Sequence, residues 1–330
     1  MSGIDIVVTW VDGNDPVWQA SRDQYVTVKG DVNASAKRFR DWDLMRYWFR
    51  GVEKFAPWVN NVYFITCGQH PEWLNVDNPK LKLVDHKEFM PADSLPTFNS
   101  NAIELCINKI KGLSDRFILF NDDFFIIDSI KETDFFRGSL PCDYAALDAV
   151  EPSEDFDYIL ANNIRVINQN FDKREVLKKH RSQWYSLKDV KSLIRTMELT
   201  KPWNQFTGFR DYHTPIAYTK KEFEDMWLRI PELIDATVHS RVRNKDNISH
   251  WLIRYWRLAS GNFVPFSQKQ WIFIPVVNGD NSYLVNTIKN RKKKIVCIND
   301  EFKGDVISAA QKSLKDAFES ILPDKSSFEI

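Results

Sequence analysis

Two adjacent aspartates, Asp122 and Asp123, lie between the apolar segments RFILF at 116–120 and FFII at 124–127. An unpaired carboxylate is costly to bury, so either the chain leaves the core here or a cation lies nearby. Carboxylate oxygens are suitable ligands for Mg²⁺, and water and phosphate oxygens complete its coordination shell. The pair therefore indicates a divalent-cation site for a diphosphate or, equally compatible with the local sequence, a turn or helix cap after a strand.

Three further residues have side chains that suit phosphate or proton transfer. Glu104 is a carboxylate, but Asn101 stands three residues before it with the spacing of a capping box. His213, in DYHTPIAYTK, belongs to the residue type most used as a general base, although a single histidine is more often structural. Arg243, in HSRVRNKDN, is typical of a solvated loop unless its guanidinium binds phosphate oxygens. Their types alone do not decide between these roles.

Apolar, β-branched segments predict the elements that position these residues. Strands are predicted at 4–11, 61–67, 80–86 and 116–120, with helices between them at 41–55 and 101–110. This alternation predicts an α/β fold, a mostly parallel Rossmann-like sheet flanked by helices, and ligands bind beyond the carboxyl ends of such strands. Asp12 should then share a rim with the Asp122–Asp123 pair.

The sequence divides into three predicted parts, the α/β core and two segments that follow it. Residues 1–150 form the α/β core, residues 151–265 a helical insertion or lid, and residues 266–330 return to the core sheet through a strand at 293–300. The last segment ends in an amphipathic helix, whose apolar face is formed by Val306, Ala310, Leu314, Phe318 and Ile321. With the basic run KNRKKK before it, this helix either docks on the domain or lies on an anionic membrane surface.

The composition favours a soluble globular protein. Of 330 residues 43% are hydrophobic and 27% charged, and 45 Lys and Arg balance 45 Asp and Glu, so no overall field attracts nucleic acid. The four cysteines form no CxxC pair, and the N-terminus lacks a signal-peptide pattern. We therefore expect a cytoplasmic protein, peripheral at most on the inner face of the plasma membrane. Absence of GxGxxG, Walker A, GxSxG and HExxH motifs argues against common nucleotide-cofactor and hydrolase classes.

Four blocks of sequence together resemble the Stealth family of sugar-1-phosphate transferases. This family includes bacterial capsular and cell-surface polysaccharide phosphotransferases and the lysosomal-enzyme N-acetylglucosamine-1-phosphotransferase. The blocks are IDIVVTWVDGNDP at 4–16; the segments 38–75, 95–104 and 117–125; the segments 213–227 and 242–247; and CINDE at 297–301.

The resemblance implies a reaction. A UDP-sugar would donate hexose-1-phosphate, N-acetylhexosamine-1-phosphate included, to a hydroxyl of a lipid-linked or polymeric glycan acceptor. The products would be UMP and a phosphodiester in a capsular or cell-surface polysaccharide. Carried over by motif, the catalytic residues would be Glu104, Asp123, His213 and Arg243.

The resemblance also implies ligand-binding residues. Mg²⁺ or Mn²⁺ would be held by Asp122, Asp123 and Asp300. Substrate would be bound by Trp10, Asp12, Gly13, Arg38, Asn121 and Asn299.

Two other classes of function remain open. A metal-dependent glycosyltransferase would also use a UDP-sugar, but it would release UDP and form a glycosidic bond. The usual Asp-X-Asp spacing is absent at Asp122 and Asp123. A non-catalytic sugar-binding protein of the same fold is disfavoured, because the four catalytic candidates are present together.

Overall fold

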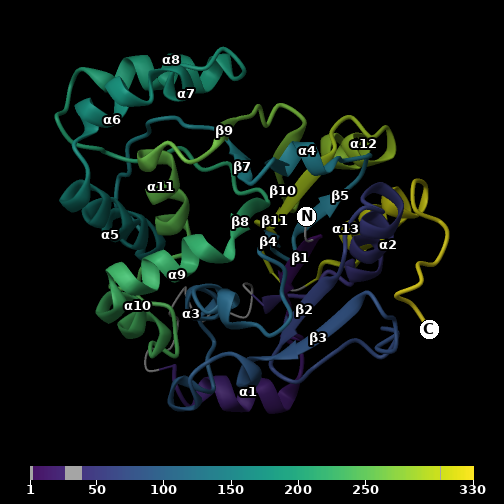
Figure 1. Ribbon diagram of the computed structural model, residues 1–330. Helices are drawn as coiled ribbons and strands as arrows, with labels where there is room; N and C mark the ends of the chain where they lie inside the picture. Colours follow the sequence, from purple (N-terminus) through teal and green to yellow (C-terminus); the bar gives the residue numbers. More distant parts are fainter. Residues whose placement is uncertain (1–2, 27–38, 305) are drawn as a thin grey trace.

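A five-stranded sheet forms the centre of the computed structural model, which describes residues 3–26, 39–304 and 306–330 (Figure 1). The strand order is β3-β2-β1-β4-β8. The first four strands are parallel, and β8 is antiparallel to β4. The bounds are β1 (Ile4–Thr9), β2 (Val62–Thr66), β3 (Leu81–Asp85), β4 (Arg116–Phe120) and β8 (Ile216–Thr219). The predicted α/β class and the four predicted strands before residue 121 are confirmed.

Two smaller sheets flank the main one. Strands β10 (Trp271–Val276), β11 (Ile295–Asp300) and β5 (Phe124–Ile126) form one in the order β10-β11-β5, and β6 (Phe136–Arg137), β7 (Leu140–Asp143) and β9 (Val264–Pro265) form the other. The predicted strand at 293–300 is therefore confirmed. In the described part of the chain, however, segment 266–330 does not rejoin the main sheet. It pairs with β5, because the chain turns after β4 and presents β5 antiparallel to β11.

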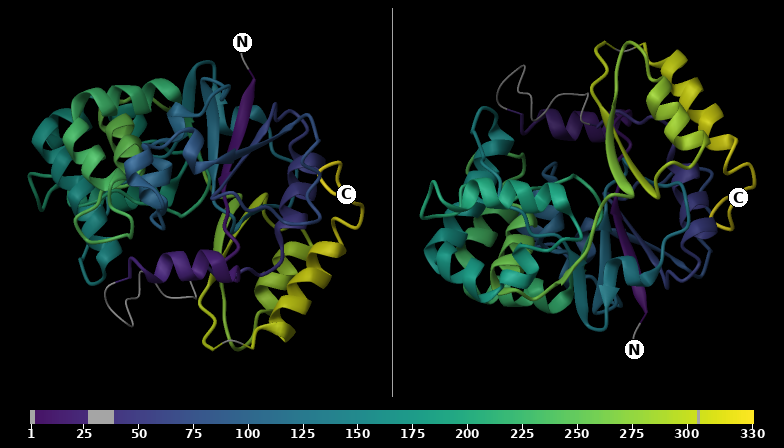
Figure 2. Two further views of the ribbon diagram at one scale, coloured as in Figure 1. Left: turned by 90° about the horizontal axis from the view of Figure 1, so that it is seen from below. Right: turned by 90° about the horizontal axis from the view of Figure 1, so that it is seen from above.

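Helices cover both faces of the main sheet. Helices α2, α12 and α13 lie on one side, and α3 and α5–α11 lie on the other (Figure 2). The segment 151–265 is mostly helical, and it also contributes β8 to the main sheet. The helices are α1 (Pro16–Asp23), α2 (Met45–Phe55), α3 (Ser100–Glu104), α4 (Glu132–Phe135), α5 (Asp155–Asn170), α6 (Lys173–Lys179), α7 (Arg181–Trp184), α8 (Val190–Thr200), α9 (Lys220–Arg229), α10 (Pro231–Val238), α11 (Trp251–Ser260), α12 (Ser282–Lys289) and α13 (Ser308–Glu319).

The core has two layers because alternate residues of each strand point to opposite faces of the sheet. Ile6 and Val8 of β1 pack with α2 and the β10-β11-β5 sheet, and Val7 packs with the helices of the other side. Gly51 of α2 lies so close to β5 that a Cβ atom there would be 2.5 Å from the carbonyl oxygen of Ile126. This contact fixes the position of β5, and with it the turn that precedes β5.

The C-terminal helix α13 docks on the domain. Leu314, Ala317 and Phe318 are buried, and the Phe318 ring stacks on Tyr47 of α2 with a centroid distance of 5.4 Å. The apolar face considered above for membrane contact is thus largely used in the core, although Val306, just before the helix, is exposed. No helix in the part of the chain that the structure describes has the length and apolar character needed to span a bilayer.

Candidate active site

A cleft of about 870 Å³ opens beyond the carboxyl ends of β1 and β4. This is the place at which parallel α/β sheets bind ligands. Nine of the predicted site residues line it: Trp10, Glu104, Asn121, Asp122, Asp123, His213, Arg243, Asn299 and Asp300. The fold therefore brings together residues from segments that are far apart in sequence.

The Asp122–Asp123 pair forms the turn between β4 and β5. The backbone N–H of Phe124 donates to the carbonyl of Asn121 at 3.2 Å, and the N–H of Ile298 in β11 donates to the carbonyl of Asp123 at 2.9 Å. The chain thus leaves the core here. Burial, followed by the charge of Asp123, raises the pKa of Asp122 to about 7.

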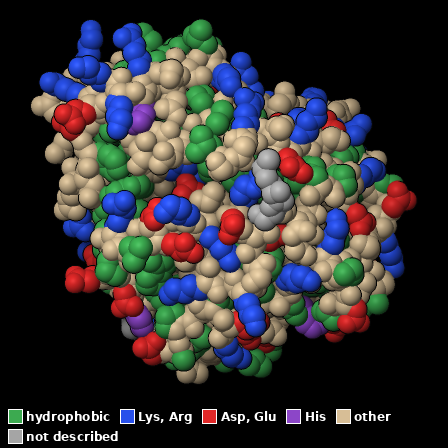
Figure 3. Space-filling model, in the orientation of Figure 1, with side chains coloured by type: hydrophobic (Ala, Val, Ile, Leu, Met, Phe, Trp, Pro, Cys, Tyr) green, Lys and Arg blue, Asp and Glu red, His purple; other side chains and the backbone are tan. Residues whose placement is uncertain are grey.

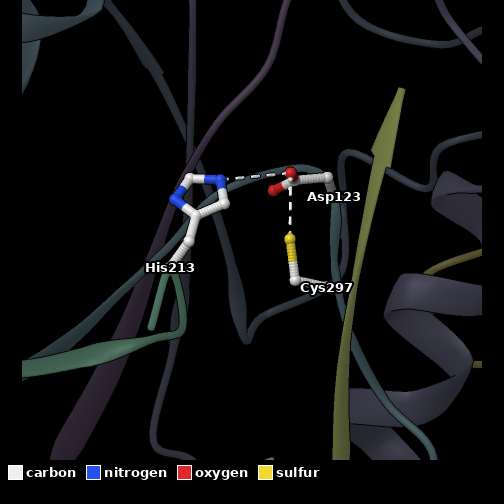
Figure 4. A group of neighbouring side chains, drawn as sticks. All are labelled: Asp123, His213 and Cys297. Atoms are coloured by element: carbon white, nitrogen blue, oxygen red, sulfur yellow. Dashed lines mark hydrogen bonds and ion pairs between the residues drawn. The ribbon is translucent and has the colours of Figure 1, made fainter. Parts of the chain in front are cut away.

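Asp123 lies between His213 and Cys297 (Figure 4). Its Oδ2 atom is 3.4 Å from Nε2 of His213 and accepts a hydrogen bond from the Cys297 thiol at 3.3 Å. Its Oδ1 atom is buried and has no hydrogen-bond partner. A buried carboxylate oxygen without a partner is unusual and needs an explanation such as a ligand or an ion.

His213 precedes β8 and is oriented by aromatic rings. The Phe124 ring packs against its imidazole in a T-shaped arrangement with a centroid distance of 5.0 Å. Its φ of 46° lies in the left-handed region, which is uncommon for a residue with a Cβ atom. Burial alone would lower the pKa of His213, but the hydrogen bond and charge of Asp123, and then the charge of Glu104, raise it.

Glu104 ends α3 and is only 5% exposed. The helix begins after Asn99, whose side chain accepts from the N–H of Asn101 at 3.2 Å, so the Asn101–Glu104 capping box does not form. Oε2 of Glu104 lies instead 3.6 Å from Nε2 of His250. Burial raises the pKa of Glu104 to about 7, against the opposing charges of Arg243 and His213.

Arg243 lies in the segment between α10 and α11. Its Nη2 atom donates to Oγ of Ser100 at 2.5 Å, and its guanidinium lies 5.6 Å from the ring centroid of Phe156. Asn99 fixes the segment by donating to Oδ1 of Asn247 at 2.9 Å. These bonds join the start of α3 to the arginine segment and aim Arg243 at the cleft.

Asp300 is held by protein groups. Its Oδ2 atom accepts from the Trp42 indole at 3.2 Å and lies 3.3 Å from Nη1 of Arg40. Among the described residues, only Asp123, His213 and Cys297 form a group of three acidic, histidine or cysteine side chains with ligand atoms within 4.8 Å of one another. The predicted set of Asp122, Asp123 and Asp300 is thus not assembled as a cluster.

The residues present nevertheless fit a hard divalent cation at Asp122 and Asp123. The described lining of the cleft carries seven carboxylates and two arginines, so a diphosphate would meet an excess of negative charge. Burial keeps the pKa of the Cys297 thiol well above its usual value, so this sulfur is a donor to Asp123 and a poor metal ligand. Carboxylate oxygens without a thiolate favour Mg²⁺ or Mn²⁺ over Zn²⁺.

Two predicted substrate residues of the described chain, Asp12 and Gly13, do not line the cleft. Asp12 caps the loop after β1 by accepting from the N–H of Asn14 at 2.9 Å. Gly13 packs against the backbone of Phe39, where an added Cβ would lie 1.9 Å from the carbonyl oxygen. Both shape the loop after β1. Arg38 lies outside the described residues.

Two residues that the sequence did not indicate complete the surroundings of Glu104. His250 is buried, and its Nδ1 is 2.9 Å from the hydroxyl of Tyr218 in β8. Burial lowers the pKa of His250 to about 3, so it is neutral. Between Ser249 and Trp251 at the start of an apolar helix, His250 is indistinguishable in sequence from a core residue.

Family models match three parts of this chain. They are Stealth protein CR1, conserved region 1, at residues 3–27; CR2, conserved region 2, at 38–141; and CR4, conserved region 4, at 286–330. Three of the four resembling blocks fall within or overlap these regions.

Relatives align over the full length. Capsular polysaccharide phosphotransferase WcwK of Streptococcus pneumoniae is 40% identical over all of this chain and 98% of its own. Exopolysaccharide phosphotransferase cps2G of Lactiplantibacillus plantarum is 42% identical over 99% of this chain and 96% of its own. Receptor polysaccharide phosphotransferase WefC of Streptococcus oralis is 36% identical over the whole of both chains. With these matches, and with the motif residues gathered in one cleft, the chain belongs to the Stealth protein family.

Proposed function

We propose that this chain is a sugar-1-phosphate transferase of capsular or exopolysaccharide synthesis. It takes hexose-1-phosphate, N-acetylhexosamine-1-phosphate included, from a UDP-sugar, attaches it to a hydroxyl of a glycan acceptor, and releases UMP. The observation that carries the proposal is that Glu104, Asp123, His213 and Arg243 line one cleft. Its full-length relatives are named as polysaccharide phosphotransferases, which supports the same class of reaction.

The reaction replaces one bond at phosphorus by another. The acceptor oxygen forms a bond to the phosphorus that carries the sugar, and the bond from that phosphorus to the bridging oxygen of UMP breaks. The acceptor proton goes to the enzyme, and the bridging oxygen leaves with UMP. Such transfers depend on positioning and on neutralising charge.

His213 is the group proposed to take the acceptor proton. With Nε2 facing Asp123 at 3.4 Å, the carboxylate fixes the ring orientation and leaves Nδ1 to accept the proton. Asp123 then stabilises the imidazolium that forms. The same division of roles between a carboxylate and an imidazole serves other transferases and hydrolases.

Arg243 is proposed to bind the phosphate oxygens. Its planar guanidinium presents several N–H donors, and Ser100 fixes one of them. When bound at Asp122 and Asp123, Mg²⁺ or Mn²⁺ would offset the negative charge of the diphosphate. The excess of carboxylates in the cleft supports both assignments.

Glu104 is proposed to position the acceptor hydroxyl. His213 is already oriented by Asp123, and Glu104 contacts the neutral His250, which Tyr218 holds from the other side. The carboxyl group is therefore fixed in a buried place near Arg243. A rigid polar group of this kind orients a nucleophile without itself reacting.

The nucleotide product tests the proposal. Purified protein is incubated with Mg²⁺, a panel of UDP-hexoses and a glycan acceptor, and UMP is separated from UDP by chromatography. Acceptor-dependent UMP together with a phosphodiester signal in the product supports sugar-1-phosphate transfer. Acceptor-dependent UDP would identify a glycosyltransferase instead and would overturn the proposal.

A further inference from the structure

Helix α8 exposes an apolar face that the active site does not use. Val190, Ile194 and Met197 are 47%, 51% and 59% exposed, and their spacing of four and three residues places them on one side of the helix. Leu187, 79% exposed, precedes the helix, and Trp203, 48% exposed, follows it. A row of exposed apolar side chains along one side of a helix marks an interaction surface.

The surroundings of this face are strongly basic. Between residues 172 and 205, seven Lys and Arg side chains are exposed against three exposed acidic ones, although the whole chain has no net charge. Figure 3 shows Lys and Arg side chains gathered over the lobe that α6, α7 and α8 form in Figure 1. The exposed basic residues are Arg174, Lys178, Lys179, Arg181, Lys188, Lys191 and Lys201.

We propose that the α8 face, defined as Leu187, Val190, Ile194, Met197 and Trp203 with the basic residues around it, docks on an anionic lipid bilayer. A helix with an apolar side bordered by Lys and Arg enters the headgroup region, where the apolar groups meet acyl chains and the cations meet lipid phosphates. Charge complementarity thus selects anionic lipid as the occupant.

The opposite face of α8 packs on the domain, so the helix is already formed before it binds a membrane. Thr196 and Leu199 are buried, and the Asp189 side chain caps the helix by accepting from the N–H of Ser192 at 3.1 Å. Docking therefore requires no folding step and costs little conformational entropy.

Two other candidate membrane contacts are weaker. The apolar side of α13 is buried against α2. The basic run at 289–294 follows α12, on the other side of the main sheet from α8. Because the run at 289–294 and the basic residues around the α8 face lie on different sides of the main sheet, variants can separate their contributions to lipid binding.

Vesicle flotation tests the proposal with the full-length chain, without requiring any activity. Vesicles contain phosphatidylcholine alone or phosphatidylcholine with phosphatidylglycerol. Wild type should float with the anionic vesicles and not with the neutral ones. The double variant Ile194→Ser/Met197→Ser should bind anionic vesicles at least about tenfold more weakly. Leu228→Ser on α9, 81% exposed, is the matched control and should bind like wild type.

A second pair of variants tests the charges. Lys188→Gln/Lys191→Gln should weaken anionic-vesicle binding, whereas Lys289→Gln/Lys292→Gln should leave it unchanged. All these side chains are exposed, and circular dichroism checks that each variant folds. Failure of wild type to bind anionic vesicles, equal binding by the α8 variants, or loss only in the 289/292 variant would overturn the proposal. So would sedimentation showing that the α8 face joins two copies of the chain without binding lipid.

Discussion

Nε2 of His213 lies 3.4 Å from Oδ2 of Asp123, although the two residues come from segments far apart in sequence, the turn before β5 and the segment before β8. His213 keeps this position with a backbone φ of 46°. Strained backbone at a cleft residue is a feature of functional sites, where the surrounding structure maintains it. The pair is the centre of the proposed chemistry.

Asp123→Asn and His213→Asn should each lower kcat by about 10²–10⁴-fold, because each removes part of one proton-accepting unit. Asparagine tolerates the left-handed backbone, so the His213 variant should remain folded. The double variant should be little worse than Asp123→Asn alone, which removes both the partner of His213 and a proposed metal ligand. These values come from steady-state kinetics.

The surface pair His239 and Asp93 is the matched control. Its Nε2 and Oδ1 atoms are 3.2 Å apart, and neither residue lines the cleft. His239→Asn should leave kcat within about twofold of wild type. Near-normal turnover in both cleft variants, or fully multiplicative losses in the double variant, would contradict the assignment of one functional pair.

Arg243→Lys should lower kcat/KM by at least about a hundredfold, because lysine keeps the charge but cannot bind two phosphate oxygens in a planar fork. Arg229→Lys provides the control. Arg229 is exposed on α9, with its guanidinium 5.1 Å from the Trp256 ring centroid. Full activity of Arg243→Lys would show that position 243 supplies charge alone.

Glu104 gives the stability of the protein a specific pH dependence. Burial raises its pKa from 4.5 to about 7 in the fold, next to His250 and in the field of Arg243 and His213. As pH rises from 4.5 to 7, the unfolded chain loses this proton before the folded chain does. The ionised carboxylate therefore destabilises the fold increasingly across this window.

Glu104→Gln should remove that cost. Relative to wild type, its free energy of unfolding should gain about 3 kcal/mol between pH 4 and pH 8, as measured by urea denaturation across that range. Glu224→Gln, at an exposed position on α9, should follow the wild-type curve. Parallel curves for Glu104→Gln and wild type would show that Glu104 is ionised without penalty.

Mg²⁺ or Mn²⁺ should stabilise the fold through Asp122 and Asp123. At a metal concentration of about a hundred times Kd, the expected gain is about 2–3 kcal/mol, seen as a higher Tm in thermal unfolding. Asp123→Asn should abolish the gain. Stabilisation by Zn²⁺ alone, lost in Cys297→Ala, would contradict the assignment of a hard-cation site.

The strands and the sheet edge at their carboxyl ends were predictable because the pattern that indicates them lies within short segments of sequence. A continuous β-branched segment such as 4–11 predicts a buried strand, and polar residues after it predict the rim. His213 and Arg243 were predicted as site residues only through the third block of the resemblance, because their local sequence is equally typical of a surface loop. The structure places them at the cleft.

Long-range pairing was not predictable in the same way. The separate sheet of β5, β10 and β11 depends on the turn after β4 and on the tight contact of Gly51 with β5. Likewise, Asn99 and Asn247 form their bond only in the folded chain, and His250 has no local signal. Such contacts join residues that no periodicity relates.

The destination of the phosphorus next to the sugar distinguishes transfer of sugar-1-phosphate from transfer of the sugar alone. UDP-sugar labelled with ³²P in the phosphate that carries the sugar is incubated with enzyme and acceptor, and label is counted in glycan and in nucleotide. Transfer of sugar-1-phosphate predicts that the label enters the glycan and that the released nucleotide is unlabelled UMP. Label recovered only in UDP, with unlabelled glycosylated acceptor, would show that the enzyme transfers the sugar alone and not sugar-1-phosphate.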